Sequence, residues 1–256
     1  MIVERFSEGA SLLHRIDPRV KIVAAFPCAF LVALAENPWA PLFALAAAGV
    51  LGASARLSPR GVLRSGRPLL IFLVFLWIVL PLSVPGTALF SLGPLQGSRE
   101  GVVQAFLISV KSLSVVLLII ALLGTSSITA LMHALSHFRV PPKLLFLAFL
   151  TFRYVFVIQR EYLRLRTAMK VRGFAPGTNL HTYKSYAYLI GMLLVRSFER
   201  SERVYQAMLC RGFRGEFFLL DHFVLRRRDG YFAAAMALLA AALGWLAWSP
   251  VMSWSI

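Results

Sequence analysis

A seven-residue pattern that ends in arginine, glycine and phenylalanine occurs twice in this chain. It runs from Ala168 to Phe174 and returns from Ala207 to Phe213. In each copy the arginine follows the alanine by four positions, so both lie on one face of a helix. An arginine can form two charge-assisted hydrogen bonds with a carboxylate, and a small alanine one turn earlier gives a partner close access to the backbone. The chemistry that this pattern predicts is protein recognition.

The two arginines, Arg172 and Arg211, also fit a simpler interpretation as parts of helix ends. Each is followed by a glycine, Gly173 or Gly212, at the position where helices commonly stop. The phenylalanine that follows can make the apolar contact of such a helix end, and an arginine there suits the helix dipole. A single copy would need no partner. Two copies, each ending a long basic helix, favour two similar docking sites for something outside the membrane.

Few other residues have the types and spacing of a reactive or metal-binding site. His133 and His137 could place two imidazoles on one helical face, but no third ligand is evident nearby, so we expect no metal site and no cofactor. The chain lacks the glycine-rich loop that holds ATP phosphates, and we expect no enzymatic activity. Lys111 lies within an apolar segment, where it could snorkel outward or contact a partner, and we favour a structural role.

The elements that carry these residues are typical of a membrane protein. The chain has 256 residues, of which 59% are hydrophobic, and a formal net charge of +16. Nucleic-acid binding could explain the charge but not the apolar runs, so the expected partner is a lipid bilayer and not a nucleic acid. Small residues in the second apolar segment, Gly49, Gly52, Ala46 and Ala53, predict close helix packing. Five segments look able to span a bilayer: 20–37, 39–55, 69–85, 102–124 and 231–249.

The positive charges orient these segments. All but two of the 27 Lys and Arg residues fall in 1–21, 56–68 and 125–229. Because cytoplasmic segments carry the excess of Lys and Arg, we expect the N-terminus in the cytoplasm and the C-terminus outside the cell membrane. The predicted fold class is all-α, a polytopic membrane protein with about five transmembrane helices and long cytoplasmic helices.

Residues 143–173 and about 184–212 admit two interpretations. Each segment begins apolar and then becomes charged. In the preferred interpretation they form two helices of about 30 residues, each about 45 Å long, whose apolar halves pack at the inner face of the membrane domain. In the alternative both apolar halves cross the membrane, giving seven crossings. That arrangement would place Arg160, Lys170, Arg172 and several other cations outside, against the charge rule.

At this point the residues show a resemblance to a known family. The paired Ala-x-x-x-Arg-Gly motifs resemble the signature of the transmembrane T component of energy-coupling factor (ECF) transporters. Asp17-Pro18-Arg19-Val20-Lys21 is similar to that family's N-terminal element, and Arg153-Tyr154 followed by Glu161 resembles the pattern ahead of its first motif. The block from Arg196 to Met208 is particularly similar to the cobalt-type subgroup, CbiQ. Tyr154 stands where the family often has phenylalanine.

This resemblance implies a coupling subunit of an importer in a bacterial cell membrane. In the family, two cytosolic ATP-binding-cassette ATPases each receive one Arg-Gly helix end, and the T component joins them to a separate membrane subunit that captures the substrate. Matched residue by residue, the ATPase-binding positions would be Ala168, Arg172, Gly173, Ala207, Arg211 and Gly212. The implied domains are transmembrane helices in 1–125, a coupling-helix region in 126–229 and a last transmembrane helix in 230–256.

The cargo stays open at this stage. Cobalt is the first expectation, and nickel or a vitamin is the alternative, because the family selects its substrate on another chain. A self-contained permease is a further alternative from a different class. It would need polar side chains along the spans, and Lys111 alone gives thin support.

Overall fold

The computed structural model describes residues 9, 11, 13–92, 95–138, 140–213 and 227–248. The chain divides into two compact units, Met1–Ala134 with His222–Ile256, and Leu135–Asp221. Helix α6, Ile128–Ser136, contains the point of division. Part of the predicted coupling region, 214–226, lies outside the described residues.

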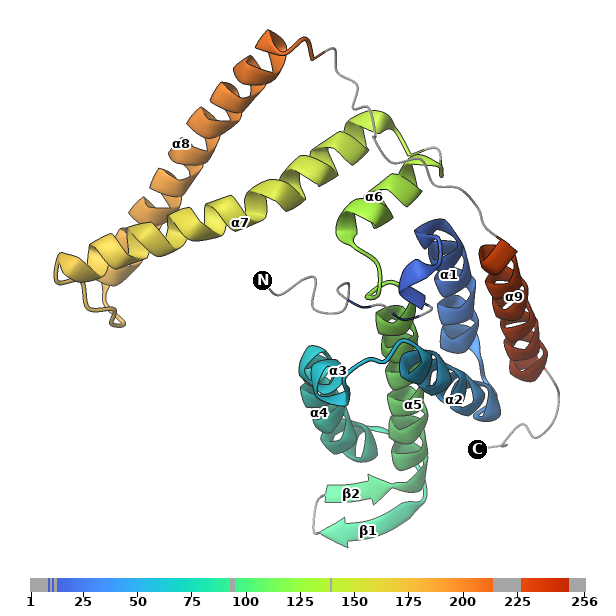
Figure 1. Ribbon diagram of the computed structural model, residues 1–256. Coiled ribbons are helices and arrows are strands. Elements are labelled where there is room, and N and C mark those ends of the chain that lie inside the picture. Colours follow the sequence, from blue (N-terminus) through green and yellow to red (C-terminus); the bar gives the residue numbers. More distant parts are fainter. Residues whose placement is uncertain are drawn as a thin grey trace. The chain divides into compact units, whose positions relative to one another are not determined.

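A helix lies at each of the five predicted spans, and all five belong to the first unit (Figure 1). They are α1 (Pro18–Leu34), α2 (Trp39–Ser54), α4 (Arg67–Ser83), α5 (Arg99–Leu122) and α9 (Arg227–Trp248). The same unit contains a short 3₁₀-helix, Leu13–Arg15, and the short helix α3, Pro59–Ser65. The second unit contains α7 (Pro142–Val171) and α8 (Leu180–Cys210).

The starts of these helices follow from capping residues in the sequence. Asp17 caps α1, where its Oδ1 accepts a hydrogen bond from the Arg19 backbone N–H, and Pro18 occupies the first helical position. Ser98 caps α5 through its Oγ, which accepts a hydrogen bond from the Gly101 N–H at 3.1 Å. Pro142 begins α7 in the same way that Pro18 begins α1.

A small β-hairpin between α4 and α5 was absent from the sequence prediction. Strand β1 (Ala88–Leu92) pairs antiparallel with β2 (Leu95–Ser98), and the register runs from Leu92 opposite Leu95 to Ala88 opposite Ser98. The pairing satisfies backbone groups in a connection that the apolar pattern marked only as a gap between spans. Such a short pairing has too few residues to produce a readable alternation.

The first unit is held together by small residues on α2 that pack against α5. Ala40, Ala44, Ala48 and Gly52 form one buried face at a spacing of four residues. Close packing on α2 is therefore present, but three of the four residues predicted to make it (Ala46, Gly49 and Ala53) are exposed, and only Gly52 is buried. The prediction used composition alone, which does not tell which face of a helix meets its neighbour.

Polar contacts connect the start of α1 to distant parts of the first unit. The buried Lys21 ammonium donates hydrogen bonds to Thr125 Oγ1 at 3.1 Å and Ser126 Oγ at 2.9 Å, just beyond α5. The backbone N–H of Asp17 donates to Asp229 Oδ1, in the first turn of α9, at 3.0 Å. The segment 17–21 therefore joins three helices that are far apart in the sequence.

Three helices in the described part of the chain are long and apolar enough to cross a membrane: α5, α7 and α9. The pair α3 and α4 passes the same test as one span broken by a bend of 62°, and α2 is a shorter apolar helix. The prediction of an all-α polytopic membrane protein is confirmed. Helix α7 has the length and composition of a span, whereas α8, which the alternative with seven crossings also requires to cross, is not among the helices that pass this test.

Candidate partner-docking site

The six predicted site residues all lie on the helical hairpin of the second unit. Helices α7 and α8 are joined by residues 172–179, and they are the longest helices in the described part of the chain (Figure 1). Ala168, Arg172 and Gly173 lie at the C-terminal end of α7. Ala207, Arg211 and Gly212 lie at the C-terminal end of α8. Each copy of the motif is therefore a helix terminus, as the sequence predicted.

The two helix ends have the same backbone geometry. Gly173 and Gly212 have φ values of +80° and +78°, in the left-handed region that glycine adopts without strain. After α7, the Phe174 N–H donates to the Met169 carbonyl at 3.1 Å and the Gly173 N–H to the Lys170 carbonyl at 3.0 Å.

After α8, the corresponding hydrogen bonds join Phe213 to Met208 at 3.1 Å and Gly212 to Leu209 at 2.9 Å. This pair of bonds defines a Schellman motif. The sequence repeat is thus a structural repeat as well.

The phenylalanine after each glycine packs on an aromatic side chain of the other helix. The Phe174 ring meets the Tyr186 ring of α8 edge to face, with 5.8 Å between centroids. The Phe213 ring stacks on the Phe146 ring of α7, with 5.3 Å between centroids. Aromatic pairs in these geometries stabilise by about 0.5–1.5 kcal/mol beyond their area burial. Each helix end is therefore anchored to its neighbouring helix.

A charged contact joins the same two helices between their ends. The Arg196 guanidinium of α8 donates a hydrogen bond to the Glu161 carboxylate of α7. Arg164, one turn further along α7, lies 3.7 Å from the same carboxylate. Together with the two aromatic pairs, this contact fixes how the two motif-bearing helices lie relative to each other.

All six motif residues are exposed on the hairpin. In the part of the chain that the structure describes, neither the Arg172 nor the Arg211 guanidinium forms a hydrogen bond or an ion pair. Val171, next to Arg172, is an apolar side chain that is 83% exposed. An arginine with free donors beside exposed apolar surface can anchor a partner carboxylate in a largely desolvated contact.

The two arginines are too far apart to form one site. Arg172 lies before the start of α8 and Arg211 directly follows its end. A helix of 31 residues is about 46 Å long at 1.5 Å per residue. The arrangement can therefore bind two bodies, or two copies of one body, at equivalent places.

The remaining sequence candidates do not gather into a second site within the described ranges. His133 is buried on α6, and His137 is exposed just beyond the end of that helix. No group of three His, Cys, Asp or Glu side chains with metal-binding geometry occurs among the described residues. Lys111 lies half-buried within α5.

Sequence reasoning missed the contacts that join α7 to α8. Glu161 was singled out only through family resemblance, and its partner Arg196 was not paired with it. Phe174 and Phe213 were expected to pack on their own helices, whereas their ring contacts reach the opposite helix. Finding these pairs requires the register of α7 against α8, which no spacing within one helix encodes.

Comparison with known proteins finds relatives that match most of this chain. Residues 9–218 match the family model described as CbiQ, cobalt transport protein. The energy-coupling factor transporter transmembrane protein EcfT of Brevibacillus brevis is 27% identical over 258 residues, which cover 95% of this chain and 97% of that protein. EcfT of Heliobacterium modesticaldum is 30% identical over 217 residues, covering 80% and 81%. EcfT of Leuconostoc gelidum is 27% identical over 229 residues, covering 84% of each.

Proposed function

The chain belongs to the CbiQ family of cobalt transport proteins, and on that premise we propose that it couples two cytosolic ATP-binding-cassette ATPases to a substrate-capture membrane subunit. It is a transmembrane component of the energy-coupling factor type and a non-catalytic subunit. One observation carries the proposal. Two equivalent helix ends, one before and one after α8, which is about 46 Å long, each present an exposed arginine that has no partner among the described residues.

Each ATPase receives one helix end. Arg172 and Arg211 are the anchors, and each forms a bidentate pair with a carboxylate of the ATPase. Ala168 and Ala207, one turn earlier on the same face, let the ATPase surface approach the helix backbone. Gly173 and Gly212 end the helices so that the arginine stands at the terminus, where the helix dipole favours a cation.

The hairpin transmits motion because its two ends are fixed to each other. The Glu161–Arg196 pair and the aromatic contacts of Phe174 and Phe213 join α7 to α8 at three places. When ATP binding brings the ATPases together, a hairpin joined in this way shifts as one body instead of bending at either end. That displacement is what reaches the capture subunit.

Cobalt is the proposed cargo. The description of the matching family and the resemblance of the block from Arg196 to Met208 to the cobalt-type subgroup support it. The ion is bound by the capture subunit in this proposal, so this chain needs no metal ligands of its own. The names of the relatives specify no cargo. The test below therefore has to separate cobalt from nickel and from a vitamin.

The test is recovery of partners with the tagged full-length chain in mild detergent, followed by mass spectrometry and by uptake of radioactive cobalt in cells. In Arg172→Glu/Arg211→Glu, the recovery of both ATPases should fall by roughly thirtyfold. This is the loss expected when an arginine that becomes buried in the complex, and that contributes about 2 kcal/mol to binding, is removed. The control variant, Arg160→Glu/Arg166→Glu, makes the same change of charge at two exposed positions of α7 outside the motifs. It should retain the ATPases.

The two single variants test how many ATPases each helix end binds. Arg172→Glu and Arg211→Glu should each lose one ATPase of two, because the helix ends bind separately. A wild-type chain that is recovered without ATPases, and that alone moves an ion into liposomes, would establish a self-contained permease instead. A capture subunit recovered with the chain that supports nickel or vitamin uptake and no cobalt uptake would refute the cargo while leaving the coupling role intact.

A further inference from the structure

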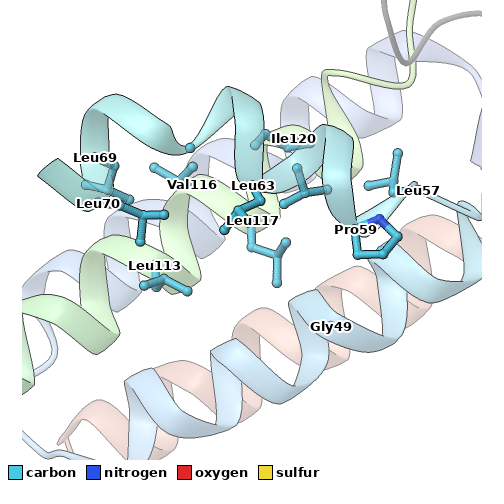
Figure 2. Close-up of a pocket in the computed structure, with 13 residues that line it drawn as sticks. Gly49, Leu57, Pro59, Leu63, Leu69, Leu70, Leu113, Val116, Leu117 and Ile120 are labelled. Carbon is cyan, nitrogen blue, oxygen red and sulfur yellow. The ribbon is translucent and has the colours of Figure 1, made fainter.

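An apolar hollow lies in the first unit, whereas the helix ends that the proposed function uses belong to the second. Figure 2 shows its walls, which come from α2, α3, α4, α5 and the turn between α2 and α3. Its volume is about 280 Å³. Its lining consists of aliphatic side chains, glycines and one proline, so it offers no side chain that could bind a polar ligand. Its lining includes Leu63, Leu70, Leu113, Val116 and Leu117, which are labelled in Figure 2.

Glycines of α2 leave room on one side of the hollow. A Cβ atom placed on Gly49 would meet no atom within 4 Å, and one placed on Gly52 would meet only Leu57 Cδ1, at 3.8 Å. A larger residue at either of these two positions of α2 would therefore place its side chain in the hollow. This property also makes Gly49 a position where a side chain can be added without a clash.

The short helix α3 presents a basic surface beside the hollow. Pro59, Val62 and Leu63 of α3 line the hollow. At 100° per residue, Arg60 and Arg64 lie together on the neighbouring face of the same helix, and both are exposed. Arg56 and Arg67 flank α3 and are exposed as well.

These four arginines are free to bind an anion. The sequence contains no Asp or Glu between Glu36 and Glu100. Among the described residues, no side chain forms an ion pair or a hydrogen bond with Arg56, Arg60, Arg64 or Arg67. The positive-inside rule places this segment at the cytoplasmic surface of the membrane. An uncompensated cluster there faces the anionic headgroups of the inner leaflet.

The bend next to Gly66 gives α3 the geometry of an interfacial helix. The axes of α3 and α4 differ in direction by 62° at this bend. Helix α3 therefore does not continue along the axis of the membrane-spanning helix α4. A helix that lies in the interface keeps its apolar side toward the acyl chains and its basic side toward the headgroups. The apolar and basic faces of α3 correspond to these two directions.

We propose that this hollow and the arginines of α3 form a binding site for one anionic phospholipid of the cytoplasmic leaflet. An acyl chain fills the hollow against Leu117 and Gly49, and the phosphate accepts hydrogen bonds from the Arg60 and Arg64 guanidinium groups. The side chains that line the hollow are entirely apolar, which suits an acyl chain. The arginines beside it, which have no ion-pair partner among the described residues, favour an anionic lipid as the occupant.

The experiment is native mass spectrometry of the full-length chain in detergent. The chain is mixed with equal amounts of phosphatidylglycerol and phosphatidylcholine that have the same acyl chains. The wild-type chain should retain one tightly bound lipid, with a preference for phosphatidylglycerol of about tenfold. Arg60→Gln/Arg64→Gln should bring this ratio close to one, because the phosphate loses its donors while the hollow remains. Gly49→Leu should reduce retention of both lipids, because the leucine side chain occupies the hollow.

Two control variants make the result specific. Gly230→Leu adds the same side chain to α9, at a glycine whose surroundings are equally open, and should bind lipid like the wild type. Arg227→Gln/Arg228→Gln removes two exposed cations from the first turn of α9 and should leave the preference unchanged. Helical content measured by circular dichroism shows that each variant is folded.

Several outcomes would overturn this proposal. Normal lipid retention in Gly49→Leu would exclude the hollow as the acyl-chain site. An equal loss of preference in Arg227→Gln/Arg228→Gln would indicate diffuse attraction of anionic lipid and no defined site. If Gly49→Leu binds lipid normally but loses the capture subunit in pull-downs, the hollow receives a protein helix instead. None of these results bears on ATPase binding, because Arg172 and Arg211 are unchanged in every variant.

Discussion

Glu161 of α7 accepts a hydrogen bond from the Arg196 guanidinium of α8, although 35 residues separate them in the sequence. The Glu161 side chain is only 14% exposed, whereas that of Arg196 is 47% exposed. Solvent therefore screens the pair only in part. A partly buried ion pair of this kind stabilises more than a fully exposed one, and it fixes the register of α7 against α8.

A double-mutant cycle with Glu161→Gln and Arg196→Met measures this contact. The expected coupling is about 1 kcal/mol, at the upper end for ion pairs that are not fully buried. The readout is the free energy of unfolding by urea in detergent. Glu199→Gln with Arg203→Met is the matched control, since that exposed pair lies at 3.8 Å within α8 alone and should give about 0.3 kcal/mol. Equal coupling in the two cycles would show that Glu161 does not hold the hairpin together.

The glycines that end α7 and α8 should resist replacement. At φ values near +80°, Gly173→Ala and Gly212→Ala each impose a left-handed conformation on a residue with a Cβ atom, which costs about 1–2 kcal/mol. Gly191→Ala makes the same change inside α8, where the added Cβ meets nothing within 4 Å. It should stabilise the helix by about 0.5–1 kcal/mol. Thermal unfolding of the three variants tests these opposite signs, and destabilisation by Gly191→Ala would contradict the argument.

The sequence was sufficient to locate the long helices and both Arg-Gly helix ends, but not the short helices α3 and α6. Apolar runs mark α1, α2, α4, α5 and α9 because a bilayer requires long apolar stretches. Gly173 and Gly212 mark the two ends because glycine is the residue that most readily adopts the left-handed conformation of a C-terminal cap. Both kinds of signal are local and are therefore readable without a structure.

Contacts between distant segments were not predictable in the same way. The buried face of α2 includes Ala44 and Ala48 and leaves Gly49 exposed, and composition does not distinguish these positions. Lys21 reads as one more cytoplasmic cation, yet its side chain is fully buried against Thr125 and Ser126. Such pairings depend on how whole helices pack. No signal within one segment carries that information.

The Lys21 contacts give a prediction about stability. Thr125→Val/Ser126→Ala leaves a buried ammonium without its two hydroxyl acceptors and should lower the free energy of unfolding by about 1–3 kcal/mol. Lys21→Met removes the ammonium and keeps an unbranched side chain of similar length, so it should cost less. Adding Lys21→Met to Thr125→Val/Ser126→Ala should therefore restore stability. If the triple variant is less stable than Thr125→Val/Ser126→Ala, the hydroxyl groups do not serve as acceptors for this charge.

The membrane topology of α7 can be tested with a single engineered cysteine. The native Cys210 does not discriminate between the two topologies, because five crossings and seven crossings both leave it in the cytoplasm. Position 178, in the connection between α7 and α8, is cytoplasmic in the topology with five crossings and external in the topology with seven. Thr178 is exposed, and Cys28 is buried, so Thr178→Cys in a Cys210→Ser background provides one reactive thiol.

A membrane-impermeant maleimide should label Thr178→Cys in inverted vesicles and leave it unlabelled in intact cells. The reason is the charge of this region, since labelling from outside would require Lys170, Arg172 and Lys184 to have crossed the membrane. Pro85→Cys in the same background is the opposite control, because residue 85 is exposed in the connection between α4 and α5 that the charge rule places outside. Labelling of Thr178→Cys in intact cells would place the first Arg-Gly helix end beyond the reach of a cytosolic ATPase, and Arg211 alone could then bind one.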